Sequence, residues 1–115
     1  MNIKTKIKHV ISYIKKKEKI PIYISKETTE LFKGKTVLIS GGSGGIGRAI
    51  ANKMKLCGAN VIISGVNEKK LKKISEEIGN ITYVILDIRS INSITNVINS
   101  LNGQIDILIN CAGIN

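Results

Sequence analysis

Eight residues in the first half of the chain, Ser40–Gly47, form a glycine-rich segment that could bind phosphate. They read Ser-Gly-Gly-Ser-Gly-Gly-Ile-Gly and contain both G-x-G-x-x-G and G-x-x-x-G-x-G spacing. Residues without a Cβ allow a tight turn and let a pyrophosphate approach the backbone. A helix beginning at this turn would add free N–H groups and partial positive charge. The segment therefore predicts a site for the diphosphate of a dinucleotide.

A mononucleotide-binding P-loop is the nearest competing motif. That motif needs a lysine and then a serine or threonine after its last glycine, because these residues hold the phosphates and the magnesium ion. Arg48 and Ala49 occupy those positions. The sequence therefore argues against ATP or GTP hydrolysis.

The residues after the second predicted strand bear on the choice between NAD and NADP. An acidic residue there would bind the ribose 2′-hydroxyl of NAD, and a nearby arginine would accommodate the 2′-phosphate of NADP. Ser64, Gly65 and Val66 supply neither. Glu68 lies at about the right distance, but the helix dipole explains an acid in a first helical turn equally well. Because Lys69 and Arg48 are near in sequence, NADP is slightly favoured over NAD.

Strands and helices alternate regularly from Lys35 onward, which is the pattern of a parallel sheet with crossover helices. The predicted strands are Thr36–Ser40, Val61–Ser64, Thr82–Leu86 and Ile105–Ile109. The predicted helices are Ile46–Cys57, one capped by Asn67 and running to Ile78, and one capped by Ser90 with Ile91, Ile94, Val97, Ile98 and Leu101 on its apolar face. We predict an α/β, Rossmann-type doubly wound sheet of about four strands. A fourth strand with nothing after it would leave an edge and a face uncovered, so we expect a truncated domain.

A basic N-terminal arm, residues 1–33, precedes this predicted domain at 34–115. Residues 1–35 hold ten of the 18 basic residues, and the whole chain carries a net charge of +10. Ile3, Ile7, Val10, Ile11 and Ile14 recur at helical spacing over residues 1–19. Pro21 should end this amphipathic helix, and residues 25–35 should form a linker. We interpret the arm as a solvated helix, with membrane-surface contact by residues 1–20 as the alternative. Nucleic-acid binding is not expected, because the arm shows neither aromatic residues interleaved with its basic residues nor an arginine cluster.

The cysteines and the single histidine offer no catalytic or metal-binding pattern. Cys57 and Cys111 lie far apart among apolar residues, which is typical of buried free thiols in a reducing compartment. His9 alone cannot build a histidine metal site, so we expect no metal. Lysines interrupt every apolar stretch near the N-terminus, and no stretch is long enough to span a bilayer. We therefore expect a cytoplasmic protein.

Three motifs in order resemble the short-chain dehydrogenase/reductase family, and in particular its 3-oxoacyl-carrier-protein reductase-like members. Ser40–Gly47 is similar to the family's T-G-x-x-x-G-I-G turn, Asp87 to its aspartate after the third strand, and Asn110–Gly113 to its N-N-A-G segment, with Cys111 in place of the second Asn. The resemblance covers about residues 34–115. It implies a cofactor site made by Gly41, Ser43, Gly44, Gly45, Ile46, Gly47, Ser64, Val66, Asp87, Ile88, Asn110, Ala112 and Gly113.

The resemblance also implies hydride transfer between a nicotinamide cofactor and a carbonyl or alcohol substrate. In that family a Ser and a Tyr-x-x-x-Lys pair farther along the chain carry the proton chemistry. Tyr13-x-x-x-Lys17 has this spacing but precedes the glycine turn, so its chain order is wrong. We expect no catalytic residue and no activity in this chain alone. The alternatives are a non-catalytic dinucleotide-binding module or an inactive truncated gene product. The full-length protein is expected to be a homo-oligomer.

Overall fold

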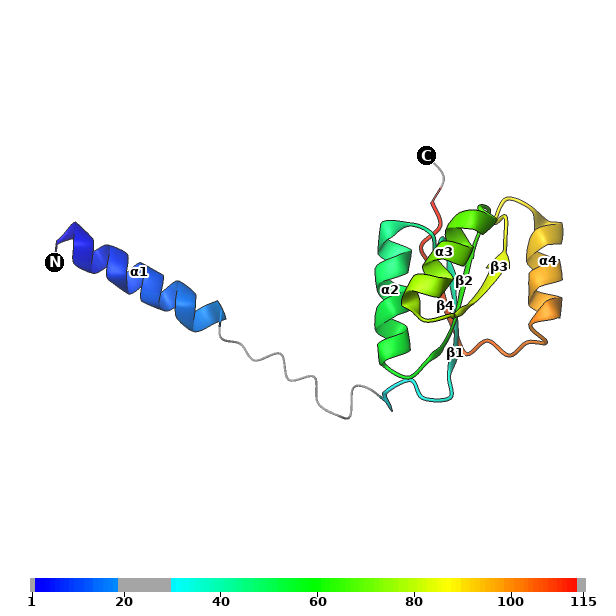
Figure 1. Cartoon of the computed structure of the whole chain (residues 1–115), viewed down its shortest axis with the longest axis horizontal. Coiled ribbons are helices and arrows are strands. Elements are labelled where there is room, and N and C mark those ends of the chain that lie inside the picture. Colours follow the sequence, from blue (N-terminus) through cyan, green and yellow to red (C-terminus); the bar gives the residue numbers. More distant parts are fainter. Residues whose placement is uncertain (1, 19–29, 114–115) are drawn as a thin grey trace.

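The computed structural model describes residues 2–18 and 30–113 of the chain. An N-terminal helix is followed by alternating strands and helices (Figure 1). The elements are α1 (Ile3–Glu18), β1 (Thr36–Ser40), α2 (Gly45–Leu56), β2 (Asn60–Gly65), α3 (Glu68–Ile78), β3 (Thr82–Ile85), α4 (Ile91–Ser100) and β4 (Ile107–Asn110). The element types agree with the predicted pattern, and most bounds differ from it by one or two residues.

The four strands form one parallel sheet in the order β3-β2-β1-β4. Leu38 at the centre of β1 pairs with Ile62 of β2 on one side and Leu108 of β4 on the other. The crossovers run outward from β1 in both directions, which is the doubly wound arrangement. Helices α2 and α3 lie on one face of the sheet and α4 on the other (Figure 1). The predicted Rossmann-type α/β fold is thereby confirmed.

The hydrophobic core lies between the sheet and the pair α2 and α3. Val37 and Ile39 of β1 and Ile63 of β2 are fully buried against Ala51 of α2 and Leu71 of α3. Val37 and Ile39 are two positions apart on β1, and side chains at alternate positions of a strand share one face of the sheet. This packing fixes where β1 and β2 end, and so fixes the loops that follow them.

Local signals set the ends of α3. The side chain of Asn67 accepts a hydrogen bond from the Lys70 backbone N–H at 3.1 Å, which caps the helix as predicted. Gly79 ends the helix with φ 115°, a left-handed conformation that glycine adopts at little cost. The Gly79 carbonyl also accepts a hydrogen bond from the Lys55 ammonium at 2.7 Å, which ties α3 to α2.

The opposite face of the sheet is less well covered. Only Val97 of the apolar series predicted for α4 is buried, and Ile91 is 80% exposed. Leu108 of the edge strand β4 is 58% exposed. The expected open edge and open face are therefore both present in the described part of the chain.

Phe32, within the segment predicted to be a linker, packs onto the core. The Phe32 N–H donates to the Cys57 carbonyl at 2.9 Å, and its partly buried ring packs on the core. Pro21 and residues 25–29 of the predicted linker lie outside the described residues. Within residues 2–18 and 30–113, no helix combines the length and apolar character needed to cross a membrane.

Candidate functional site

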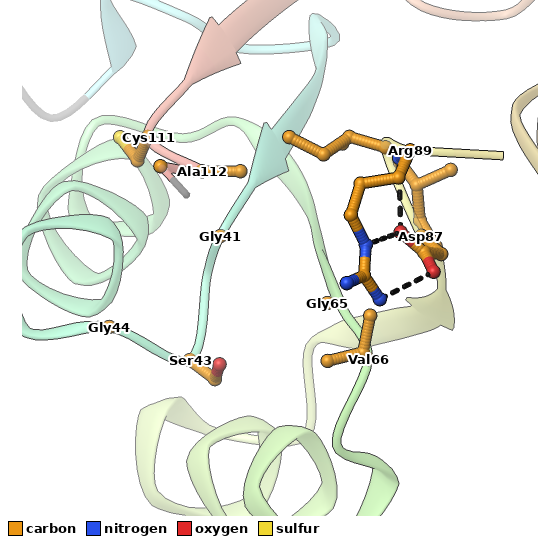
Figure 2. A pocket seen from close by; sticks show the side chains of 12 residues that line it. Gly41, Ser43, Gly44, Gly65, Val66, Asp87, Arg89, Cys111 and Ala112 are labelled. Carbon is orange, nitrogen blue, oxygen red and sulfur yellow. Dashed lines mark hydrogen bonds and ion pairs between the residues drawn. The ribbon is translucent and has the colours of Figure 1, made fainter. Parts of the chain in front are cut away.

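A cavity of about 460 Å³ opens where all four strands end. Its walls come from the loops after β1, β2, β3 and β4, which lie at the carboxyl edge of the sheet where ligands of such folds bind. Figure 2 shows the glycine turn on one side, Asp87 and Arg89 on the other, and Gly65 and Val66 between them. The lining residues are Gly41, Ser43, Gly44, Gly65, Val66, Leu86, Asp87, Ile88, Arg89, Cys111, Ala112 and Gly113.

Three glycines of the turn occupy positions where no side chain fits. Gly41 has φ 72°, and a Cβ there would lie 2.6 Å from the Ala112 backbone nitrogen. A Cβ on Gly42 would lie 2.5 Å from Cβ of Ile63, and one on Gly47 would collide with the Gly41 carbonyl oxygen. The turn is therefore packed against β2, the segment after β4 and the start of α2 at the same time.

The N-cap residue of α2, Gly44, lines the cavity, and the helix start beside it is uncapped. Gly44 is the N-cap residue and makes no side-chain capping hydrogen bond. The first N–H groups of a helix have no intrahelical acceptor, so those of Gly45, Ile46 and Gly47 are available to an anion. The donor set at the helix start, next to the cavity-lining Gly44, fits a diphosphate group.

Eight of the predicted cofactor residues line the cavity, and five do not. The five are Gly45, Ile46, Gly47, Ser64 and Asn110. Ser64 is buried, and its hydroxyl donates to the Ile39 carbonyl at 3.1 Å, which joins β2 to β1. The Asn110 side-chain oxygen accepts a hydrogen bond from the Ser40 hydroxyl at 3.3 Å. Ser64 and Asn110 therefore hold the strand ends together and do not face the cavity.

Four lining residues were absent from the predicted set: Gly65, Leu86, Arg89 and Cys111. Cys111 was expected to be buried, but it is half-buried in the cavity wall. The position of Arg89 two residues after Asp87 is the sequence feature that could have indicated its place in the site. Its Nε and Nη2 atoms both donate to the Asp87 carboxylate at 2.9 Å, and its backbone N–H donates to the same carboxylate at 3.0 Å.

The pairing with Arg89 determines the charge state of Asp87. Hydrogen bonds from the Arg89 side chain, and then from its backbone N–H, hold the pKa of the Asp87 carboxyl below its ordinary value, although slight desolvation opposes them. The same pairing raises the pKa of the guanidinium. The Asp87 backbone N–H also donates to the Ser93 hydroxyl at 3.0 Å, so the first turn of α4 positions this residue. Asp87 is thus a fixed, ionised acceptor in the cavity wall.

Replacing Arg89 by Gln should raise the pKa of Asp87 toward its ordinary value, because the side-chain hydrogen bonds that stabilise the carboxylate are weakened. When the pKa of a carboxyl is lower in the folded than in the unfolded state, the folded state is stabilised at any pH above the unfolded-state pKa. This stabilisation is lost as the pH falls through the folded-state pKa. Carboxyl-carbon NMR titration measures the shift directly. Arg48→Gln is the matched control and should leave the Asp87 titration unchanged. An unaltered Asp87 titration in Arg89→Gln would contradict the assigned pairing.

Arg48 does not take the position near the ribose that its place in the sequence indicated. Its Nη2 atom lies 2.5 Å from the Glu77 carboxylate of α3. The pair borders a separate cavity lined by Gly45, Arg48, Ala49, Asn52, Glu77 and Ile78. Arg48 points there because α2 packs on α3, which brings a basic and an acidic side chain together. Among the described residues the arginine that lines the strand-end cavity is Arg89.

Comparison with known proteins agrees with this geometry. A family model described as "short chain dehydrogenase" matches residues 35–115. A 3-oxoacyl-acyl-carrier-protein reductase from Rickettsia bellii is 40% identical over 82 residues, which is 70% of this chain and 34% of the relative. A short chain dehydrogenase from Mycobacterium smegmatis superimposes with a TM-score of 0.68 at 32% identity, covering 74% of this chain and 39% of that one.

A third similar protein is a short chain dehydrogenase from Shigella flexneri whose structure is a complex with NADP. It superimposes with a TM-score of 0.69 at 26% identity, covering 75% of this chain and 40% of that one. In each of these comparisons the chain spans between about one third and two fifths of the other protein's length.

Proposed function

Because the chain belongs to the short-chain dehydrogenase family, we propose that its strand-end cavity binds the adenosine diphosphate part of a nicotinamide dinucleotide. The observation that carries this proposal is the turn at Gly41–Gly47, where several Cβ positions are blocked and the start of α2 is left uncapped. Backbone N–H groups in this arrangement attract a diphosphate by hydrogen bonding and by the helix dipole. The bound dinucleotide would supply the hydride chemistry.

Each wall of the cavity has a distinct proposed role. At the glycine turn, the N–H groups of Gly45, Ile46 and Gly47, which follow the cavity-lining Gly44, would hold the diphosphate. Val66 and Ile88 provide apolar surface on either side of an adenine ring, and the Asp87 carboxylate accepts a hydrogen bond from the ring's amino group. In the described structure Val66 is 65% exposed and Ile88 41% exposed, so both can contact a planar ligand without rearranging the core.

NADP is the favoured cofactor within this proposal. The segment Gly65–Val66 carries no acid that would repel a 2′-phosphate. Among the described residues, the one carboxylate that lines the cavity, on Asp87, is already paired with Arg89. Arg48, in contrast, lends no support because Glu77 engages it. The related Shigella flexneri protein is a complex with NADP, which supports the same preference.

Titrating the 115-residue chain with NADPH should enhance and blue-shift the nicotinamide fluorescence in a saturable manner. We expect Arg48→Gln to bind NADPH like the unaltered chain, because that side chain is turned away from the cavity. ATP at equal concentration should compete weakly, since Arg48 and Ala49 stand where a mononucleotide loop has its lysine and its hydroxyl residue. Absence of any binding at millimolar NADPH or NADH would refute the proposal.

For the whole protein we propose hydride transfer between the cofactor and an unknown carbonyl or alcohol substrate, within a homo-oligomer. The 3-oxoacyl-acyl-carrier-protein reductase from Rickettsia bellii supports this reaction class. Tyr13 and Lys17 lie on α1, before the glycine turn, and are given no catalytic role. Free Cys57 and Cys111 support a reducing, cytoplasmic setting. A dinucleotide-binding module without catalysis is the alternative; it would bind NADPH without oxidising it in the presence of oxoacyl substrates.

A further inference from the structure

Helix α1 carries an apolar stripe that stands open to solvent. Ile3 is 75% exposed, Ile7 51%, Val10 58% and Ile11 45%. These residues recur at intervals of three and four, which places them on one face of a helix with 3.6 residues per turn. A continuous apolar stripe on an isolated helix is typical of a surface that binds an apolar partner.

Lysines border this stripe. Helical spacing places Lys4 and Lys8 on one side of it and Lys6 on the other, and all three are exposed. The sequence extends the pattern with Ile14 in the apolar series and a run of three lysines after it. The helix holds six lysines and one glutamate, and no acid in its first turn. Its partner must therefore offer apolar and anionic groups together.

The rest of the described chain does not supply such a partner. Residues 30–113 contain six acidic residues, and four of them already have partners. These are Glu30 with Lys33, Glu77 with Arg48, Asp87 with Arg89, and Asp106, which accepts the Thr36 backbone N–H at 2.8 Å. The remaining two, Glu68 and Glu76, lie on α3 beside four lysines of the same helix. The open face at α4 and β4 is apolar but not acidic.

We propose that α1 is a membrane-surface anchor that lies in the interface of a bilayer containing anionic lipid. The apolar stripe enters the boundary between headgroups and acyl chains, and the bordering lysines extend their ammonium groups to the anionic headgroups. Lipid fits the helix better than nucleic acid, because a polyanion without an apolar phase would leave the stripe in water. The dinucleotide site plays no part in this inference.

Vesicle co-sedimentation of the 115-residue chain tests the anchor. The chain should pellet with phosphatidylcholine–phosphatidylserine vesicles at roughly 3:1 and much less with pure phosphatidylcholine, since each basic residue near an anionic surface adds attraction. High salt should weaken the binding. Equal binding to both vesicle types, or no binding to either, would overturn the proposal.

A matched pair of double variants separates insertion from simple charge attraction. Ile7→Asp with Ile11→Asp puts two carboxylates into the stripe, whereas Thr5→Asp with Ser12→Asp puts the same charge on the polar face. We expect the stripe variant to partition about ten-fold or more weakly than the polar-face variant, because it alone loses apolar contact. Helix content on binding, measured by circular dichroism, should rise for the polar-face variant only. Equal partitioning of the two variants would show attraction to any polyanion and would overturn the anchor.

Discussion

Replacing Gly47 by alanine should destabilise the fold by about 3 kcal/mol, at the upper end of the usual cost of overpacking. A Cβ at this position would collide with the Gly41 carbonyl oxygen and lie 3.0 Å from Cα of Gly42. These are backbone atoms, so they cannot rotate away as a flexible side chain could. The same Gly41 oxygen accepts the Gly44 N–H at 3.1 Å, so moving it would also break the turn. Urea unfolding followed by far-UV circular dichroism measures the loss.

Gly45→Ala is the control for this prediction, because a Cβ there meets nothing within 4 Å. It keeps its backbone N–H and gains helix propensity at the first position of α2, so stability should be unchanged or slightly higher. NADPH binding should survive in Gly45→Ala and fall about ten-fold or more in Gly47→Ala, since the shifted turn no longer aims its backbone N–H groups at the diphosphate. If the two variants unfold at the same urea concentration, the close packing of the turn is not what requires glycine.

The elements that build the site could be predicted because their signals are local. The turn at Gly41–Gly47 follows an apolar strand and opens a helix, Asn67 caps α3, and Gly79 ends it. Alternating strands and helices then require the strands to be parallel, so their carboxyl ends share one edge. The meeting of the four loops around one cavity followed from that topology without any knowledge of side-chain positions.

Side-chain partners across elements could not be predicted in the same way. Sequence spacing placed Arg48 near the cofactor, but the packing of α2 on α3 gives it Glu77 instead. The place of Arg89 in the cavity wall could not be predicted, because it depends on how the backbone bends after β3. There the Asp87 carboxylate accepts hydrogen bonds from both the main chain and the side chain of Arg89. An open face was expected from the topology, but the residues of α4 that stay exposed were not, since a helical stripe indicates which face is apolar and not what covers each residue.

Replacing Gly65 by aspartate should reverse the cofactor preference. Gly65 ends β2 and lines the cavity, and a Cβ there would have only ordinary contacts, with the Ser43 hydroxyl at 3.5 Å and Leu71 at 3.6 Å. Its φ lies outside the left-handed region, so a side chain brings no backbone strain. A carboxylate at this point would accept the ribose 2′-hydroxyl of NADH and repel the 2′-phosphate of NADPH. The ratio of the two dissociation constants should change by about 100-fold, which corresponds to about 2.7 kcal/mol.

Gly65→Asn isolates the charge, because asparagine has nearly the same shape as aspartate and no net charge. Fluorescence titration with each cofactor should show that Asn alters both affinities modestly and in the same direction, whereas Asp alters them in opposite directions. If Asn changes the preference as much as Asp, the effect is steric, and the absence of an acid at the end of β2 does not govern cofactor choice. Within residues 30–113 the cavity has a single lining carboxylate, on Asp87, and it is paired with Arg89. Such a cavity is electrostatically suited to an added phosphate, and one new carboxylate removes that advantage.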